Sequence, residues 1–419
     1  MRFLMMVLMW LGSLSAHAVL NIEISGAGER QIPIAIVPFE GEEKLGSPIS
    51  NVVAADLART GLFRLIDPVG KNPHRPSEVN YADWLGTEAI AIGAIVEQPN
   101  GRLEVQVRLL DSVKHVELNG RSINGRDTQT RSIAHRIADY IYETLTGVPG
   151  VFSTRIAYVN RHQGKFKLVV ADSDGYGEQV IFSSDEPIMS PSWSPDGSHL
   201  AYVSFETGHA AVFVQSLVTG QRLKIADYPG SNSAPAWSPD GRLMAMVLSK
   251  DGSSQIYLAK PDGSELRRVT DSPRTVIDTE PCFSPDGQHL LFTSDRGGNA
   301  QIYRMAVDGG SAHRLTFEAG SSFSPRYSPD GLGFVYTYRN AGRFYIATQD
   351  LTTGQMQLLT EGGWEKRPSF APNGKLVLYA SDAQGRGILS TVSSDGRVKQ
   401  RMFAQIGDIR EPVWGPYLK

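Results

Sequence analysis

Pro235-Ala236-Trp237-Ser238-Pro239-Asp240-Gly241 is the stretch of sequence around which this chain is organised. The same phrase recurs with small changes at residues 191–197, 281–287 and 325–331, and a looser copy occupies residues 368–374. A last fragment, Pro-Val-Trp-Gly-Pro, lies at residues 412–416. The aromatic residue of each copy recurs every 43 to 46 residues, at Trp193, Trp237, Phe283, Tyr327, Phe370 and Trp414.

Self-similarity at this period indicates a repeat architecture, and roughly 40–45 residues per repeat is typical of a four-stranded propeller blade. Ser-Pro-Asp-Gly is a turn tetrapeptide, because Pro presets φ, Asp bonds the nearby backbone and Gly takes the last position without steric strain. The phrase therefore predicts a strand, a tight turn and a second strand in each repeat. We interpret the aromatic residues as core wedges between neighbouring sheets and not as ligand contacts.

The two ends of the repeat array predict how the ring closes. Residues 154–159, 166–171 and 179–182 match the second, third and fourth strands of a blade, with no first strand before them. Residues 411–414 match a first strand with nothing after it. The two pieces make one blade, so the sequence predicts a six-bladed β-propeller closed by the C-terminal strand. Such closure removes the free sheet edges of an open array.

Composition excludes several classes of protein. Of the 419 residues, 41% are hydrophobic and 20% are charged, which is typical of a folded protein and not of a disordered one. A formal net charge of −3 and the lack of a basic run argue against nucleic acid as a partner. Cys282 is the single cysteine, so no intrachain disulfide can form, and its place beside Phe283 predicts a small core residue.

The first 18 residues have the pattern of a secretory signal peptide. Arg2 supplies a positive start, residues 3–14 are an apolar run, and Ala16-His17-Ala18 is a small-x-small site that predicts cleavage between Ala18 and Val19. The apolar run is shorter than the roughly 20 residues that a membrane span needs, which disfavours a retained anchor. We therefore expect an exported mature protein without a membrane span.

Residues 19–147 predict an α/β domain with two helices on a mixed sheet. Residues 32–39 read as a buried strand, and a hairpin over residues 89–111 turns at Pro99-Asn100-Gly101. One helix opens at Ser47-Pro48, with Ser as the cap, and an amphipathic helix spans residues 130–146.

The remaining boundaries follow from these elements. Residues 148–152 form a short linker, and residues 153–419 form the propeller. The lack of a long flexible tether predicts that the two domains pack against one another.

The sequence offers little catalytic chemistry. It contains no Gly-x-Ser-x-Gly elbow, no Walker-type loop and no His-Glu-x-x-His motif. Asp172-Ser173-Asp174-Gly175 begins like a calcium loop, but its twelfth position holds Ser183 where a Glu is required, which favours a strand-connecting turn. We expect no cofactor and no metal. The alternative is an exported propeller enzyme, a lactonase-like hydrolase, whose channel carboxylates would converge on one metal ion.

The combined pattern resembles the TolB family, the soluble periplasmic components of the Tol-Pal cell-envelope system of Gram-negative bacteria. The resemblance rests on the signal peptide, the Ser-Pro-Asp-Gly blades, Pro33-Ile34-Ala35-Ile36-Val37-Pro38-Phe39, Thr293-Ser294-Asp295, residues 299–303 and Trp414-Gly415-Pro416-Tyr417-Leu418. It implies a monomeric, non-enzymatic scaffold that binds Pal, the peptidoglycan-associated lipoprotein, and TolA. The system supports outer-membrane integrity and invagination during cell division, and other outer-membrane proteins and bacteriocins are further partners.

The resemblance also implies two binding regions. Pal docks at the mouth of the propeller channel in this family, and the matching residues here are Ala234, Pro235, Thr279, Glu280 and Pro281. The equivalent steps of the other blades, by repeat geometry, are Ser190, Ser324, Arg367 and Glu411. The sequence departs from the family pattern at Gly230-Ser231-Asn232, where a histidine is expected. The alternative interpretation of Thr279 and Glu280 is a capped, solvated loop.

The mature N-terminus is the second region that the resemblance implies, as a TolA-binding strand that is added to an exposed sheet edge. The alternative is a plain edge strand of the α/β domain. The segment comprises Val19, Leu20, Asn21, Ile22, Glu23, Ile24 and Ser25.

Overall fold

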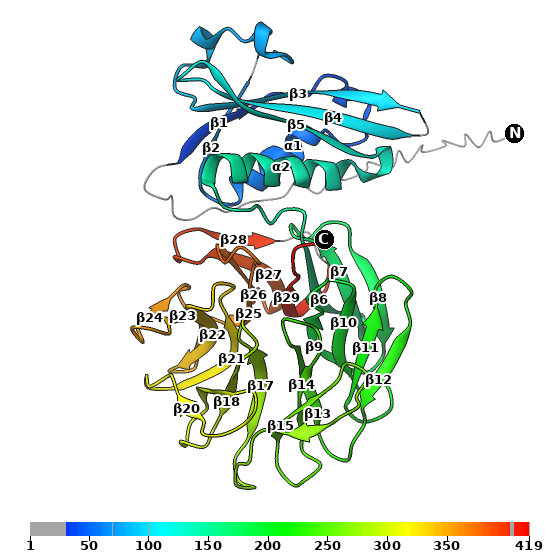
Figure 1. The fold of residues 1–419 in the computed structure, drawn as a ribbon, viewed down its shortest axis with the longest axis vertical. Coiled ribbons are helices and arrows are strands. Elements are labelled where there is room, and N and C mark those ends of the chain that lie inside the picture. The colour runs from blue at the N-terminus through cyan, green and yellow to red at the C-terminus, as the bar shows by residue number, and fades with distance from the viewer. Residues whose placement is uncertain (1–30, 69, 100, 403–405, 419) are drawn as a thin grey trace, which may run out of the picture.

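The computed structural model describes residues 31–68, 70–99, 101–402 and 406–418, which form an α/β domain followed by a β-propeller (Figure 1). The predicted signal peptide with its cleavage site, and the predicted TolA-binding strand, lie outside the described residues. No helix in these ranges combines the length and the apolar composition that a bilayer crossing demands.

The described part of the α/β domain contains one mixed five-stranded sheet, in the order β2-β1-β3-β4-β5, and two α-helices that pack on it. Strand β1 is parallel to β2 and β3, and β4 is antiparallel to β3 and β5. The elements are β1 (Ile32–Ile36), η1 (Glu42–Lys44), α1 (Ile49–Ala58), β2 (Phe63–Ile66), η2 (Pro76–Glu78), η3 (Tyr81–Trp84), β3 (Ala89–Gln98), β4 (Arg102–Asp111), β5 (Val116–Arg126), η4 (Asp127–Gln129) and α2 (Thr130–Thr146).

Helix α1 begins differently from its prediction. Pro48, and not Ser47, is the residue that flanks the helix, and no side chain caps it. The prediction was wrong because Pro48 has extended backbone, at φ −60° and ψ 130°, and so lies before the first helical residue. Helix α2 spans its predicted residues and ends at Gly147, whose φ of 72° is the left-handed conformation common after a helix.

Six four-stranded antiparallel sheets follow in the described chain, and each is one blade of the propeller. The first strands of neighbouring blades contact one another all round the ring, so they line the central channel. Blades one to three are β9 (Ile188–Trp193), β10 (His199–Ser204), β11 (Ala211–Ser216), β12 (Arg222–Ala226); β13 (Asn232–Trp237), β14 (Met244–Leu248), β15 (Gln255–Ala259), β16 (Arg267–Arg268); and β17 (Asp278–Phe283), β18 (His289–Ser294), β19 (Gln301–Ala306), β20 (His313–Arg314). Blades four to six are β21 (Ser321–Tyr327), β22 (Gly333–Asn340), β23 (Arg343–Asp350), β24 (Met356–Leu358); β25 (Lys366–Phe370), β26 (Leu376–Ala383), β27 (Arg386–Ser393), β28 (Lys399–Met402); and β29 (Asp408–Trp414), β6 (Arg155–His162), β7 (Lys165–Asp172), β8 (Gln179–Ser184).

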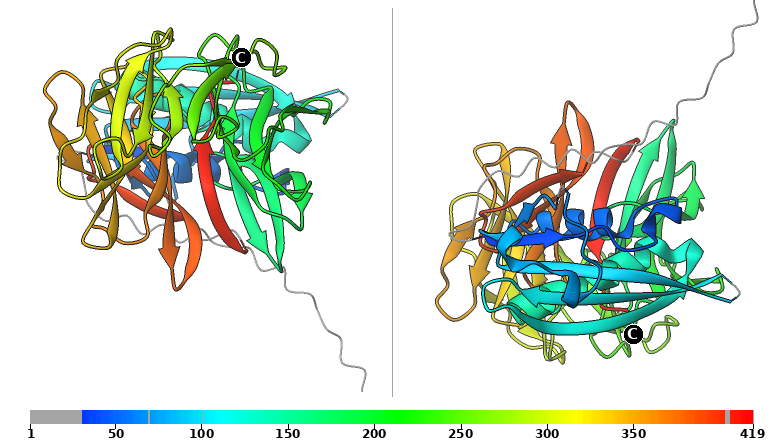
Figure 2. Two further views of the ribbon diagram at one scale, coloured as in Figure 1. Left: turned by 90° about the horizontal axis from the view of Figure 1, so that it is seen from below. Right: turned by 90° about the horizontal axis from the view of Figure 1, so that it is seen from above.

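The C-terminal strand closes the ring, as predicted. Strand β29 is antiparallel to β6, with Trp414 opposite Ile156, and it supplies the innermost strand of blade six. In Figure 2 the red C-terminal strand lies beside green strands of the start of the propeller, and its neighbour in the sheet is β6. The buried Trp414 side chain donates its Nε1–H to Thr154 Oγ1 at 2.8 Å, which joins the end of the propeller to its beginning.

The repeated phrase forms the predicted turns. In blade two, Asp240 accepts hydrogen bonds from Ser238 Oγ at 2.6 Å and from the Arg242 N–H at 3.0 Å, and Gly241 has a φ of 72°. Trp193, Phe283 and Trp414 are buried wedges, and the other three aromatic anchors are partly buried. Cys282 is only half-buried and not the core residue that was predicted, because it lies in a bulged strand beside the channel.

The α/β domain packs on blades five and six at one end of the channel. Asn373, which follows the end of the innermost strand β25, donates its Nδ2–H to the Pro149 carbonyl oxygen at 3.1 Å. The innermost strands therefore begin at the opposite end of the channel, which we call the channel mouth.

Candidate functional site

A bulge in each innermost strand places one residue at the channel in left-handed backbone. Each of these residues precedes a proline, and a proline cannot donate to the sheet ladder, so the pairing shifts register there. Left-handed backbone in a non-glycine residue costs on the order of 1–3 kcal/mol and concentrates at functional sites. The six residues, which we call the channel ring, have φ between 48° and 56°: Ser190, Ala234, Glu280, Ser324, Arg367 and Glu411.

Glu280 is the most highly bonded member of the channel ring. Its carboxylate accepts hydrogen bonds from the Ser324 N–H and Oγ–H, both at 2.7 Å, and from Thr293 Oγ1 at 2.9 Å. Arg367 Nη1 lies 2.7 Å from Glu280 Oε1 and completes the set. Burial opposes ionisation, but Arg367 and the Ser324 donors outweigh it and lower the pKa of Glu280.

Arg367 extends the network across the channel. Its Nε lies 3.2 Å from Glu411 Oε2, and the Ser190 N–H donates to the same Glu411 oxygen at 3.3 Å. Burial opposes the guanidinium charge, but the Glu411 and Glu280 carboxylates raise the pKa of Arg367. The network thus links blades three to six and reaches blade one.

The predicted Pal-binding residues fall into two groups. Pro235 and Pro281 are buried in their bulges, whereas Ala234 and Thr279 are half-buried at the channel. The Glu280 side chain is 13% exposed and bonded inside the channel, which is not the solvated loop of the alternative interpretation.

Four exposed apolar residues at the channel mouth were missed by the sequence prediction. Each lies in the loop that enters an innermost strand, in four consecutive blades. All four residues stand just before an innermost strand, so the repeat could have placed them at the mouth. No sequence signal, however, indicated that their side chains are exposed. This apolar crescent comprises Ile277, Phe317, Trp364 and Ile406, which are 50%, 70%, 64% and 72% exposed.

A cavity of about 810 Å³ lies next to the crescent, between blades five and six. Trp364 and the backbone of β29 line it, and its charged residues include members of the channel ring. They are Lys366, Arg367, Asp382, Asp408, Arg410 and Glu411.

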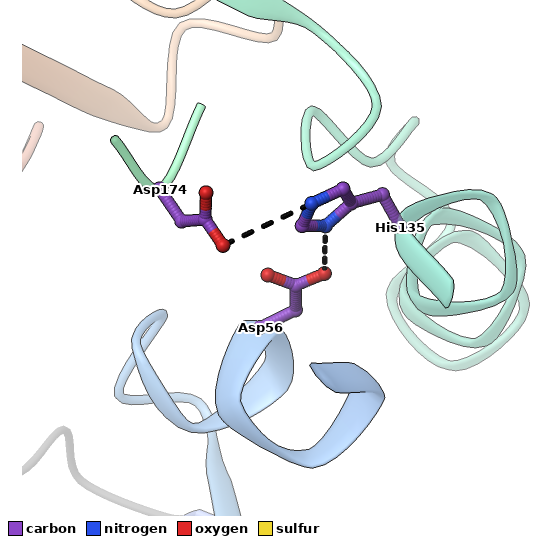
Figure 3. A group of neighbouring side chains, drawn as sticks. All are labelled: Asp56, His135 and Asp174. Carbon is purple, nitrogen blue, oxygen red and sulfur yellow. Dashed lines mark hydrogen bonds and ion pairs between the residues drawn. The ribbon is translucent and has the colours of Figure 1, made fainter. Parts of the chain in front are cut away.

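A second group of charged side chains joins the two domains (Figure 3). His135 Nδ1 of α2 lies 2.6 Å from Asp56 Oδ2 of α1, and His135 Nε2 lies 3.8 Å from Asp174 Oδ2 of blade six. The sequence prediction treated residues 172–175 only as a turn and missed this contact. With two arginines and one further carboxylate, this interdomain cluster comprises Asp56, Arg59, Arg131, His135, Asp172 and Asp174.

The interdomain cluster fits an imidazolium better than a metal ion. Asp56, His135 and Asp174 offer ligand atoms within 4.8 Å of one another, but Arg59 pairs with Asp56 and Arg131 pairs with Asp174. Burial would lower the pKa of His135, but Asp56 and Asp172 raise it to about 10. A protonated His135 with the two arginines balances the three carboxylates, whereas a divalent cation would add excess positive charge.

The channel carboxylates are also engaged by a cation of the chain itself. Glu280 and Glu411 both contact Arg367. The lactonase-like alternative requires channel carboxylates that converge on one metal ion. These two carboxylates instead converge on Arg367.

Comparison with known proteins covers nearly the whole chain. Residues 20–118 match the TolB amino-terminal domain, and residues 142–418 match the TolB beta propeller domain. The Tol-Pal system protein TolB of Nitrosomonas europaea is 54% identical over 99% of this chain and 97% of its own length. The protein of the same name from Bordetella avium is 51% identical over 96% of this chain and 92% of its own. The crystal structure of TolB from Acinetobacter baumannii has a TM-score of 0.85 and 36% identity, and covers 95% of this chain and 100% of that one.

Proposed function

This chain belongs to the TolB family of the Tol-Pal system, and on that premise we propose that it is a non-enzymatic periplasmic scaffold. It binds Pal at the channel mouth and TolA through its mature N-terminus. In this role it supports outer-membrane integrity and the inward movement of the outer membrane during division. Bacteriocins that enter through the same system would use the same surfaces.

The apolar crescent is the observation that supports docking at the channel mouth. Exposed apolar surface is a candidate protein interaction site, and these four side chains lie in the mouth-end loops of four consecutive blades. The crescent borders the channel ring, where six strained residues lie together. Strain of this kind persists where function requires a particular backbone shape.

Calorimetric titration of residues 19–419 with the soluble domain of Pal from the same organism tests the Pal proposal. We expect saturable one-to-one binding, and Glu280→Gln should weaken it by about tenfold if Glu280 lies at the contact. Gln is preferable to a cationic residue, because Lys would place a second positive charge against Arg367 and so disturb the channel ring itself. Glu265→Gln, an exposed change at the opposite end of blade two, is the control. Lack of binding by two demonstrably folded proteins would overturn the Pal proposal.

The TolA proposal rests on the family and on the position of residues 19–25 ahead of β1. We expect that deletion of residues 19–25 abolishes TolA binding and leaves the thermal transitions of the protein unchanged. A chain with these residues replaced by glycine and serine should behave like the deletion, because strand addition needs alternating side chains for specificity. TolA binding retained by both variants would contradict the proposal.

A further inference from the structure

Trp364 is held in place by backbone hydrogen bonds of its loop and by an aromatic neighbour. The N–H and C=O of the preceding Gly363 bond to the Phe344 backbone at 2.8 and 2.9 Å, and the rings of Phe344 and Trp364 lie 5.9 Å apart. A Cβ at Gly362 would overlap the ring of Tyr345, so only glycine lets the loop approach this closely. The indole is therefore presented to solvent in one arrangement, which lowers the entropy that binding must overcome.

Lys366 lies beside this indole, and it forms no close ion pair with the described carboxylates. Its Nζ lies 3.8 Å from the centre of the Trp364 ring and 4.3 Å from that of Phe344. In the described part of the chain, no carboxylate oxygen lies within 4.0 Å of Nζ. Burial, followed by the nearby Arg410, Arg367 and Arg339, lowers the pKa of Lys366, and the weaker attraction of Glu411 only partly offsets this.

Two of the neighbouring cations, Arg410 and Arg367, differ from Lys366 in having acidic partners. Arg410 Nη2 lies 2.7 Å from Asp408, and Arg367 is shared by Glu280 and Glu411. Among the described cations that line the cavity between blades five and six, Lys366 is thus the one without an ion-pair partner within 4.0 Å. An anionic group that entered this cavity would relieve the repulsion on Lys366 without breaking an existing pair.

We propose that Trp364 and Lys366 are the anchor of the Pal interface: Pal covers the indole with an apolar side chain and places a carboxylate against Lys366. This inference rests on the proposed function, in which Pal docks at the channel mouth. Tryptophan is enriched among the few residues that carry most of the affinity of an interface. The carboxylate adds charge complementarity, which sets orientation and association rate.

Two substitutions separate the apolar and the charged contributions, and calorimetric titration with Pal measures both. Trp364→Ala should weaken binding at least about tenfold at every salt concentration. Lys366→Met keeps a long side chain on the two rings and removes only the charge. It should weaken binding about fivefold at low salt, and the difference from the unchanged protein should shrink as NaCl screens the pair.

Matched controls lie at the opposite end of the propeller. Leu332 is 63% exposed, close to the 64% of Trp364, so Leu332→Ala removes a similarly exposed apolar side chain. Arg242→Met removes an exposed cation from the turn of blade two. Each control should change the affinity by less than about twofold, as surface changes outside an interface do.

The outcomes distinguish this inference from the function on which it rests. If Pal binds one-to-one with the same affinity after Trp364→Ala, the proposed anchor would be overturned, but docking of Pal at the channel mouth would stand. If the loss of affinity caused by Lys366→Met does not depend on salt, the proposed contact between Lys366 and a carboxylate of Pal would be overturned. Absence of binding by the unchanged, folded protein would overturn both the proposed function and the anchor. Thermal unfolding of each variant shows whether it is folded.

Discussion

His135 illustrates how neighbours decide the charge of a single buried residue. Burial alone favours the neutral imidazole, because a charge is poorly solvated inside a protein. Asp56 holds Nδ1 at 2.6 Å, and Asp172 and Asp174 both lie 3.8 Å from Nε2, so the carboxylates reverse that preference. The pKa of His135 is therefore higher in the folded protein than in the unfolded chain, so protonation of His135 stabilises the fold. This stabilisation is complete below the ordinary pKa of 6.5 and is lost as pH rises through about 10.

The first prediction concerns this pH dependence. His135→Gln removes the imidazolium and leaves three carboxylates with two arginines, so it should lower the melting temperature most at pH 6. The difference from the unchanged protein should narrow as pH rises from 7 to 10, because the unchanged protein then loses the same charge. Calorimetry at several pH values measures it.

The exposed His313 supplies the control for this experiment. His313→Gln should shift the melting temperature by a small amount that does not follow the same pH course. A His135→Gln difference that stayed constant from pH 6 to pH 10 would contradict a raised pKa.

At the scale of one element, the loop that enters β25 depends on a pair of adjacent glycines. Gly362 has a φ of 87°, and a Cβ there would overlap Tyr345, whereas Gly363 has space around it. A side chain at Gly362 must therefore move the loop that carries Trp364. The same substitution one residue later meets no obstacle.

The second prediction compares the two glycines. Gly362→Ala should lower the free energy of unfolding by about 1–3 kcal/mol, through left-handed backbone and overlap with the ring. Gly363→Ala should change it by less than about 0.5 kcal/mol. Chemical denaturation followed by tryptophan fluorescence measures both, and equal effects of the two changes would show that the loop is not held as described.

At the scale of the whole molecule, the ring is closed by one strand from the far end of the chain. Strand β29 pairs with β6 along its length, and Trp414 is buried between blades five and six. Its backbone N–H also donates to Ser369 Oγ of blade five at 3.0 Å. One tryptophan thus connects the last strand to both of its neighbours.

The third prediction concerns that closure. Trp414→Ala should destabilise the propeller by about 4 kcal/mol, because it removes a large buried side chain and leaves Thr154 without its donor. Trp364→Ala is a control of the same residue type, because the exposed Trp364 should contribute less than about 1 kcal/mol. Calorimetry of the propeller transition measures both. Similar losses for the two variants would contradict the assigned role of Trp414 in closure.

The sequence alone determined the repeat, the number of blades and the way in which the ring closes. These depend on local chemistry: a Pro-Asp-Gly turn forms wherever it occurs, and a fixed spacing of aromatic residues specifies identical units. The family resemblance and the repeat geometry also gave the sequence positions of the channel ring, since each of its residues stands at the same step before a proline. The hairpin over residues 89–111 followed from its turn, and the helix over residues 130–146 followed from its periodicity. The strand predicted over residues 32–39 ends earlier, at Ile36, and the cap of α1 was placed one residue too early, at Ser47.

Only the tertiary structure decided what the charged residues do. Glu280, Arg367 and Glu411 are 44 to 131 residues apart in sequence, and only closure of the ring brings them into contact. Asp174 meets His135 because its turn faces a helix of the other domain, so packing of the two domains makes this contact. Whether Trp364 is a core wedge or an exposed side chain likewise depends on what packs around it. Ion pairing and exposure are properties of neighbours in space, and the order of residues along a chain does not specify those neighbours until the fold has formed.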